Sequence, residues 1–195
     1  MKSFRSVTSH ALVLDRPDVD TDQIIPKQFL KRIERTGFGE FLFFDWRNDE
    51  EDFVLERPEF RHAPILVAGE NFGSGSSREH APWALQDWGF RVIVAPSFAD
   101  IFQSNCTKVG LLPVVLEPAA VRELLDAAPA IATVDLESLT VTLPSGRGVP
   151  FDIHPTTRTN LLNGSDDVAL TLLREAEIAV YEGTRERTGP DTTAL

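Results

Sequence analysis

The feature that most constrains the fold lies in the middle of the chain, where two buried-strand patterns enclose a glycine- and serine-rich loop and a helical pattern. APILVAG at 63–69 is an apolar run of strand length that closes in glycine, and RVIVAP at 91–96 is a second such run. Between them, SSREHAPWALQDWG at 76–89 is typical of a helix. A strand, a glycine-rich loop, a helix and a strand within roughly 30 residues predict a βαβ unit, and such units bind ligands beside the loop that follows the first strand.

Further strand and helix patterns flank this unit. A chain of 195 residues has the size of one domain and can bury roughly 70 % of the surface that it exposes when unfolded. We therefore expect a single α/β domain over residues 1–185, with a central mixed or parallel sheet flanked by helices. The other expected strands are 7–14, 111–116 and a hairpin or small meander at 132–153; the other expected helices are 27–33, 97–110 from a Ser97 cap to a Gly110 stop, 118–128, 157–164 and 165–183.

Two segments lack the regular spacing of apolar residues that marks a helix or a strand. Residues 31–60 are rich in aromatic and charged side chains without helical or strand spacing, which predicts an irregular flap. Residues 186–195 predict a frayed tail.

The charge balance narrows the choice of partners. The chain has 19 Lys and Arg against 30 Asp and Glu, a formal net charge of −11, which disfavours nucleic acid and anionic membrane surfaces. No apolar core of a signal peptide follows Lys2, and no run approaches the eighteen apolar residues of a membrane span. We expect a cytoplasmic protein that binds any anion through a local cluster of donors.

Cysteine and histidine counts bear on metal binding. Cys106 is the single cysteine, so the chain forms no internal disulfide and does not supply the several thiolates of an iron–sulfur cluster. The four histidines are widely scattered, without zinc-ligand spacing. We expect no metal site within this chain, and any cluster that the chemistry needs belongs to another chain.

The loop itself, GENFGSGSSREHAPWAL at 69–85, has two interpretations. Ser76 and Glu79 have the spacing of a helix capping box, in which both side chains bond backbone amides. The same position at a helix N-terminus favours a bound anion. Pro82 would interrupt a helix that starts at Ser76, so the helix begins later or kinks.

Arg78 and His80 also allow two interpretations. The planar guanidinium of Arg78 matches a carboxylate or a phosphate, with glycines nearby that admit a small ligand to the backbone; alternatively it pairs with Glu79 or another acid. His80 is either a structural histidine or a catalytic one. The stretch lacks the Lys-Ser/Thr ending of a P-loop, the third glycine of a dinucleotide fingerprint and the spacing of a nucleophile elbow. A small-anion loop remains, with a hydroxyl beside a guanidinium.

These residues, together with motifs along nearly the whole chain, resemble the small subunits of 3-isopropylmalate dehydratase, the swivelling domain of the aconitase superfamily, in its longer bacterial form. The G-S-S-R motif alone is weakly specific, but the motifs in this order are highly specific. They are VDTDQIIPKQFLKRIERTGFG at 19–39, FLFFDWR at 41–47, ENFGSGSSREHAPWAL at 70–85, GFRVIVAPSFADIFQSN at 89–105, GLLPV at 110–114 and LLNGSDDVALTL at 161–172.

The resemblance implies roles for three consecutive loop residues. Ser76 matches the catalytic base of the superfamily, while Ser77 and Arg78 match residues that bind the substrate carboxylate. A neutral serine is a poor base, so its alkoxide needs strong local stabilisation, which Arg78 and nearby N–H donors would supply.

Other positions match less directly. Asp20, Thr21 and Asp22 match a D-T-D element whose expected part is to position the site; an Asx-type turn is the alternative. Arg35 and Thr36 lie where the superfamily varies its recognition of the substrate side chain.

Four further loop residues complete the expected positioning set, and one position departs from the pattern. The four are Gly73, Gly75, Glu79 and His80. Ser74 stands where many relatives have cysteine, which argues against an essential thiol.

The resemblance also implies a reaction and a partner. The expected activity interconverts 2-isopropylmalate and 3-isopropylmalate by dehydration and rehydration in leucine biosynthesis. A 4Fe–4S cluster is expected on a separate large subunit, so the active site would lie between chains. Two alternatives stay open: a small subunit acting on a related acid such as homoaconitate, citraconate or a methyl-substituted malate, and a non-catalytic anion-binding or assembly module.

Overall fold

The computed structural model of the chain describes residues 1–32 and 35–185. The expected frayed tail at 186–195 and two positions of the expected flap, 33 and 34, lie outside the described residues.

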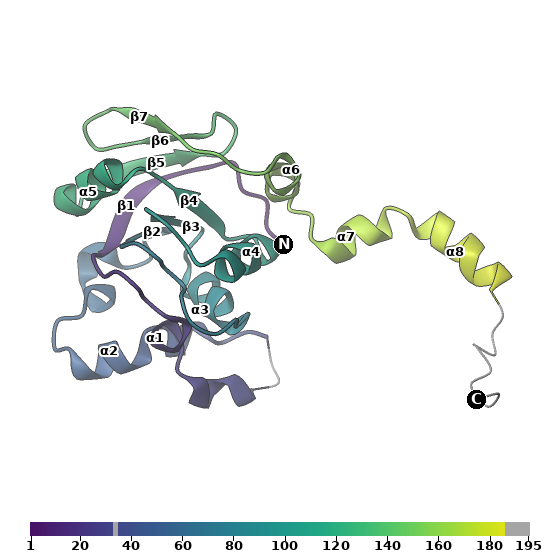
Figure 1. Cartoon of the computed structure of the whole chain (residues 1–195), viewed down its shortest axis with the longest axis horizontal. Coiled ribbons are helices and arrows are strands. Elements are labelled where there is room, and N and C mark those ends of the chain that lie inside the picture. Colours follow the sequence, from purple (N-terminus) through teal and green to yellow (C-terminus); the bar gives the residue numbers. More distant parts are fainter. Residues whose placement is uncertain (33–34, 186–195) are drawn as a thin grey trace.

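Within the described residues, one sheet of seven strands forms the centre of the molecule, in the order β4-β3-β2-β1-β5-β6-β7 (Figure 1). From β1 to β4 neighbouring strands pair in parallel, whereas β5, β6 and β7 add antiparallel strands on the other side of β1. The sheet is therefore mixed, within the range expected from the sequence. The strands are β1 (Ser6–Leu14), β2 (Ile65–Ala68), β3 (Val92–Ala95), β4 (Leu112–Val115), β5 (Ile131–Asp135), β6 (Thr140–Thr142) and β7 (Gly148–Pro150).

Two hydrophobic cores lie on opposite faces of this sheet. The side chains of β2 alternate between them: Leu66 belongs to one core and Val67 to the other, and every residue of β2 is buried. Burial on both faces explains why the strand is a continuous apolar run rather than an alternating pattern. Helices α3 (His80–Trp88) and α4 (Asp100–Val109) cover the first face, and α5 (Pro118–Ala127) with the end of α6 (Pro155–Asn163) covers the second.

The expected βαβ unit is confirmed in β2, α3 and β3. The two strands are parallel neighbours, with Val67 opposite Val94. The helix begins at His80 rather than at 76, which places Pro82 in the first turn, where a missing N–H breaks no intrahelical bond. It ends at Gly89, whose φ of +126° suits glycine.

The described residues of the segment 31–60 form short helical turns and irregular connections, with no strand among them. Its aromatic residues are structural, because Phe38, Phe43 and Phe53 are buried in the first core. The Phe43 ring stacks on Trp46 with centroids 5.4 Å apart. In and before this segment the turns are α1 (Thr21–Ile24), η1 (Lys27–Lys31), η2 (Gly39–Phe41), α2 (Phe44–Asp49), η3 (Val54–Glu56) and η4 (Pro58–Phe60).

The C-terminal helices leave the body of the molecule. The chain turns at Gly164, which has a φ of +69°, and continues as α7 (Asp167–Leu172) and α8 (Glu175–Thr184). In Figure 1 both helices extend away from the sheet and its flanking helices. Leu161 in α6 is the last residue of the described chain that is fully buried.

Candidate active site in the loop between β2 and α3

Two glycines give the loop after β2 its path. Gly73 has a φ of +78° and Gly75 a φ of +84°, both in the region that favours glycine. A Cβ at Gly73 would lie 2.1 Å from Cγ of Phe102, so no larger residue fits there without displacement of α4. A Cβ at Gly75 would lie 3.3 Å from Cβ of Asp20. The glycines therefore let the loop pack tightly between α1 and α4.

The D-T-D element holds the loop from the other side. The backbone N–H of Thr21 donates to the carbonyl of Ser74 at 2.9 Å, and its hydroxyl donates to the carbonyl of Ser76 at 2.8 Å. Thr21 is one of the few buried polar side chains, with 2 % of its surface exposed. Asp20 and Gln23 form a capping box at the start of α1, in which the Gln23 N–H donates to the Asp20 carboxylate at 2.8 Å. The element therefore forms the turn that the sequence left open and also makes contacts that hold the loop.

Asp22 points from the same element to Arg78. Both terminal nitrogens of the guanidinium donate to its carboxylate, one of them over 2.8 Å. The Arg78 side chain is 14 % exposed and that of Asp22 is 50 % exposed. The hydrogen bond from Arg78 lowers the pKa of Asp22, with Lys27 adding a smaller effect in the same direction. The ion pair left open by the sequence is thus formed, with Asp22 rather than Glu79.

A cavity of about 250 Å³ opens beside this pair. Its walls come from Thr21, from the loop at 73–78 and from the start of α4. Ser76 and Ser77 are exposed there, and within the described chain neither hydroxyl makes a hydrogen bond. The small size, together with the polar groups of Ser76, Ser77 and Arg78 in the lining, suits a short polar molecule.

The start of α4 forms the wall of the cavity opposite the serines. Residues 99–102 line it, and Ala99 precedes the helix without a side-chain cap, so the first-turn N–H groups lack a side-chain acceptor. Such groups and the helix dipole favour an anion, although Asp100 in this turn offsets part of the effect. The expected cap at Ser97 is wrong, because the Ser97 hydroxyl instead accepts the N–H of Asn71 at 2.8 Å.

The capping box proposed for Ser76 and Glu79 is also wrong. Helix α3 begins at His80, with Glu79 at the N-cap position, and no side-chain hydrogen bond caps it. Ser76 therefore lies outside the helix, in the loop that lines the cavity. A helix cap therefore does not account for the hydroxyl of Ser76.

His80 packs among aromatic rings. Its ring centroid lies 5.1 Å from that of Phe38 and 4.8 Å from that of Trp83. Burial lowers the pKa of His80, so the imidazole is neutral near pH 7. This environment is that of a packed histidine at the base of the loop.

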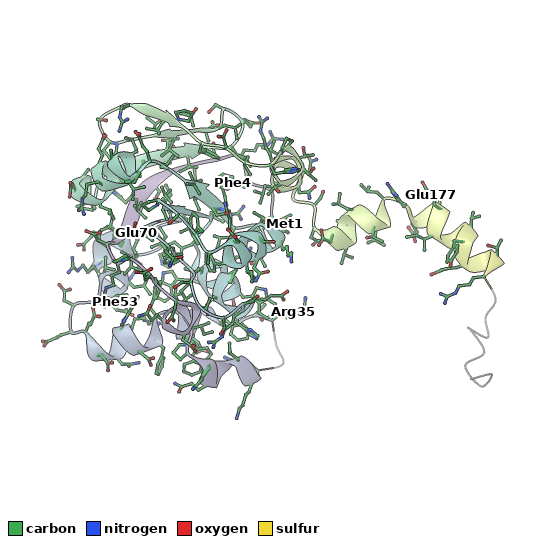
Figure 2. The ribbon with its side chains drawn as sticks, viewed as in Figure 1. Met1, Phe4, Arg35, Phe53, Glu70 and Glu177 are labelled. Carbon is green, nitrogen blue, oxygen red and sulfur yellow. The ribbon has the colours of Figure 1, made fainter. Side chains whose placement is uncertain are left out.

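Arg35 and Thr36 lie apart from the cavity of the serines. The guanidinium of Arg35 lies over the ring of Trp83, 5.5 Å from its centroid, and lines a second cavity of about 260 Å³ that Glu79 also lines. Figure 2 labels Arg35 at the edge of the body. Thr36 is exposed. The structure thus brings Thr21, Gly73, Gly75 and the three consecutive residues Ser76, Ser77 and Arg78 together around one cavity, but not this pair.

Sequence reasoning missed the wall formed by α4. The sequence did contain a signal for this wall. The α4 segment directly follows β3, and the carboxyl ends of neighbouring parallel strands meet at one edge of a sheet. A larger cavity of about 900 Å³ lies elsewhere, next to α3 and the flap. Glu40, Glu56 and Asp87 face it, so it is a poorer place for an anion than the loop.

The described residues do not fit an iron–sulfur cluster. They contain no group of three or more His, Cys, Asp or Glu side chains able to hold a metal ion. Cys106 is completely buried in the first core, and burial raises its pKa well above the usual range of a thiol.

In the described part of the chain, no helix is long and apolar enough to cross a membrane.

Comparison with known proteins agrees with this fold and loop. Residues 1–119 match the family described as the aconitase C-terminal domain. The 3-isopropylmalate dehydratase of Methanocaldococcus jannaschii has a similar structure, with a TM-score of 0.69 and 26 % identity, covering 90 % of this chain and 99 % of that one. Fold and loop therefore define an aconitase-type C-terminal domain.

More similar sequences narrow the family. The 3-isopropylmalate dehydratase small subunit of Rubrobacter xylanophilus is 56 % identical over 194 residues, which cover 97 % of this chain and 98 % of that protein. The proteins of the same name from Bacillus licheniformis and Bacillus subtilis are 54 % and 50 % identical, each over 95 % of this chain and 97 % of their own length. The chain belongs to the family of 3-isopropylmalate dehydratase small subunits.

Proposed function

We propose that the chain is the small subunit of a hydro-lyase that interconverts 2-isopropylmalate and 3-isopropylmalate, as part of leucine biosynthesis. The observation that carries the proposal is the cavity between the loop and α4, where the unbonded hydroxyl of Ser76 lies exposed near Arg78. Family membership supplies the reaction, and this geometry supplies groups that suit it.

Ser76 removes or returns the proton on carbon in this proposal. The exposed side chain is available to a substrate, and within the described residues no protein acceptor competes for its proton. Its backbone carbonyl is held by the Thr21 hydroxyl at 2.8 Å, which limits the positions that the serine can take. A fixed position for the base lowers the entropic part of the barrier.

Arg78 and Ser77 bind a carboxylate of the substrate in this proposal. A guanidinium has five N–H donors, of which Asp22 takes two, so the pair leaves donors for a second carboxylate. The first turn of α4 adds N–H groups across the cavity. A substrate with two carboxylates can therefore be bound despite the formal net charge of −11.

The remaining parts of the site come from a large subunit in this proposal. The name of the relatives implies such a partner, and the described residues supply no ligands for an iron–sulfur cluster. A 4Fe–4S cluster on the large subunit would supply Lewis-acid chemistry at the departing hydroxyl. We propose that the two chains meet over the cavity beside Ser76 and work in the cytoplasm.

Reconstitution with the large subunit tests the function. The isolated chain should be inactive, and the assembled pair should convert each isopropylmalate into the other. Ser76→Ala should lower kcat at least about 1,000-fold with assembly intact, because it removes the base. Ser74→Ala is the matched control, since that hydroxyl bonds the Asp18 carbonyl at 3.2 Å instead of standing free, and it should retain kcat within about twofold.

Two results would contradict the proposal. Substantial turnover by the isolated chain would show that no partner is required for the site. Unchanged kcat in Ser76→Ala would leave the loop with an anion-binding or assembly role. Competition between isopropylmalates and homoaconitate, citraconate or methyl-substituted malates on the assembled pair would decide the substrate.

A further inference from the structure

The C-terminal helices form an arm that is separate from both cores. We use the name arm for residues 165–185, which contain α7 and α8. From 171 to 185 every residue is exposed except Ile178, which is half-buried. Figure 2 labels Glu177 on α8, well away from the body. The arm is thus held by its own local hydrogen bonds, by its attachment at Gly164 and, at its base, by an ion pair of Asp166 with the N-terminal amino group of Met1 at 3.3 Å.

The arm exposes large apolar side chains among charged ones. Its large exposed side chains are Val168, Leu172, Leu173, Val180 and Tyr181, with exposed fractions from 59 % to 80 %. Between α7 and α8 a groove of about 920 Å³ is lined by Leu170, Leu173, Ile178 and Tyr181, among others. Short helices without tertiary packing are marginal in water, and contiguous apolar surface of this kind marks an interaction site.

The body of the chain does not cover this surface. Neither hydrophobic core of the described chain includes a residue of the arm, and the core on the α5 side closes with Leu161 and Leu162. The arm therefore adds nothing to the packing that holds the sheet together. Within the described residues, nothing covers its large apolar side chains.

The base of the arm continues the surface around the candidate site. Asp166, Asp167 and Val168 line the same cavity of about 260 Å³ as Glu79, the residue that follows Arg78. A chain that closes over Ser76 and Arg78 can therefore extend past Glu79 onto α7 without a gap. This continuity favours the catalytic partner as the molecule that covers the arm.

Charge argues against a second copy of this chain. Glu175, Glu177 and Glu182 lie on α8, and although Arg174 and Arg185 also line the groove, the whole chain carries a formal net charge of −11. Two acidic arms would repel one another, whereas an apolar surface edged with basic side chains complements them. A large subunit that presents such a surface beside the candidate site would meet both requirements.

We propose that the arm docks, through the groove of Leu173 and Tyr181, on an apolar and basic surface of the large subunit. The identity of the partner rests on the proposed function. The docked arm would hold the two chains together outside the active site, while the loop around Ser76 carries the chemistry.

Binding of the purified large subunit to the full-length small subunit tests the proposal. The double variant Leu173→Glu, Tyr181→Glu should raise the Kd at least tenfold, and the assay should need correspondingly more large subunit for half-maximal activity. Ile131→Glu is the matched control: this residue of β5 is 53 % exposed on the body, and its replacement should change Kd less than twofold. Circular dichroism and urea unfolding should show that both variants remain folded.

The outcomes separate this inference from the proposed function. Both the docking proposal and the proposed function are supported if two results are found together. The Ser76→Ala subunit should bind the large subunit normally but turn over poorly, and the arm variant should bind the large subunit poorly. If the arm variant binds the large subunit weakly but no assembled pair shows isomerase activity, the docking proposal is supported and the proposed reaction is contradicted. Unchanged Kd in the arm variant, or a wild-type homodimer that sedimentation shows to be lost in it, overturns the docking proposal.

Discussion

The loop at 69–79 and the arm at 165–185 both lie at the surface, yet their backbones are held in different ways. The loop exposes polar side chains on a backbone that is bonded to α1 and packed against α4, through Thr21 and Gly73 among others. The arm exposes apolar side chains on helices that touch neither core. In the proposals above, a site that needs exact positions is built in advance by this chain, whereas a surface that only needs area is left for a partner to cover.

The largest expected contrast concerns glycines. Gly73→Ala should destabilise the chain by about 3 kcal/mol or more, because the new Cβ would overlap Phe102 and the φ of +78° disfavours alanine. Urea unfolding of the isolated chain measures this free energy. Gly183→Ala, in α8 with nothing within 4 Å of the added Cβ, should instead stabilise its helix by up to about 1 kcal/mol. Equal effects of the two replacements would show that the loop is no more tightly held than the arm.

The next contrast concerns ion pairs. Asp22→Asn removes a charged partner from Arg78 and should lower kcat/KM of the assembled enzyme roughly 10- to 100-fold, because Arg78 is then free to leave its position. Asp52→Asn removes a comparable pair with Arg57 in the flap, at 2.9 Å, and should change kcat/KM less than twofold. Steady-state kinetics at saturating large subunit measures both. A loss in both variants alike would point to a general charge effect.

A smaller effect is expected at Thr21. Thr21→Val removes the hydroxyl that donates to the Ser76 carbonyl while keeping the shape of the side chain, and should cost about 1 kcal/mol of unfolding free energy. Thr21→Ser keeps the donor, so it should restore most of kcat if the bond positions Ser76. If the valine variant keeps full kcat, the hydroxyl does not position the base.

The smallest effect is the dependence of stability on pH through Asp22. Because Arg78 lowers the folded-state pKa of Asp22, the pair stabilises the fold above the ordinary carboxyl pKa of about 4, and this contribution is lost as pH falls through the lower folded value. The side chain is half exposed, so the contribution should be below about 1 kcal/mol. Urea unfolding at pH 7 and pH 3 should show a larger loss for wild type than for Asp22→Asn. Identical losses would mean that the pair has no net effect on folding.

Local sequence predicted those parts of the fold that depend on neighbours in the chain. The apolar runs around 65–68 and 92–95 are strands of a βαβ unit, and the glycines of the loop do adopt positive φ values. The helix limits were less accurate, because Ser76 and Ser97 have the composition of caps but their positions are set by other contacts. Ser97 accepts the N–H of Asn71, 26 residues away, which no local pattern contains.

The site was predicted in part for the same reason. Ser76, Ser77 and Arg78 are consecutive, so their shared location follows from one motif. The pair of Arg78 with Asp22 joins residues 56 positions apart, and sequence reasoning left its partner open. Arg35, assigned to the same site by resemblance, lies over Trp83 beside the second cavity. Its role in substrate recognition stays a prediction.

By itself, the sequence determined the class of fold, the family and the loop that we propose as the active site, because these depend on apolar periodicity, glycine positions and short motifs. Only the tertiary structure decided which acid pairs with Arg78, that α4 forms the opposite wall of the cavity, and that α7 and α8 stay outside the cores. These three outcomes depend on contacts between distant segments and on which apolar surfaces meet in space. The helical pattern of the arm is the same whether it packs on its own body or waits for a partner, so only the arrangement of the whole chain distinguishes the two.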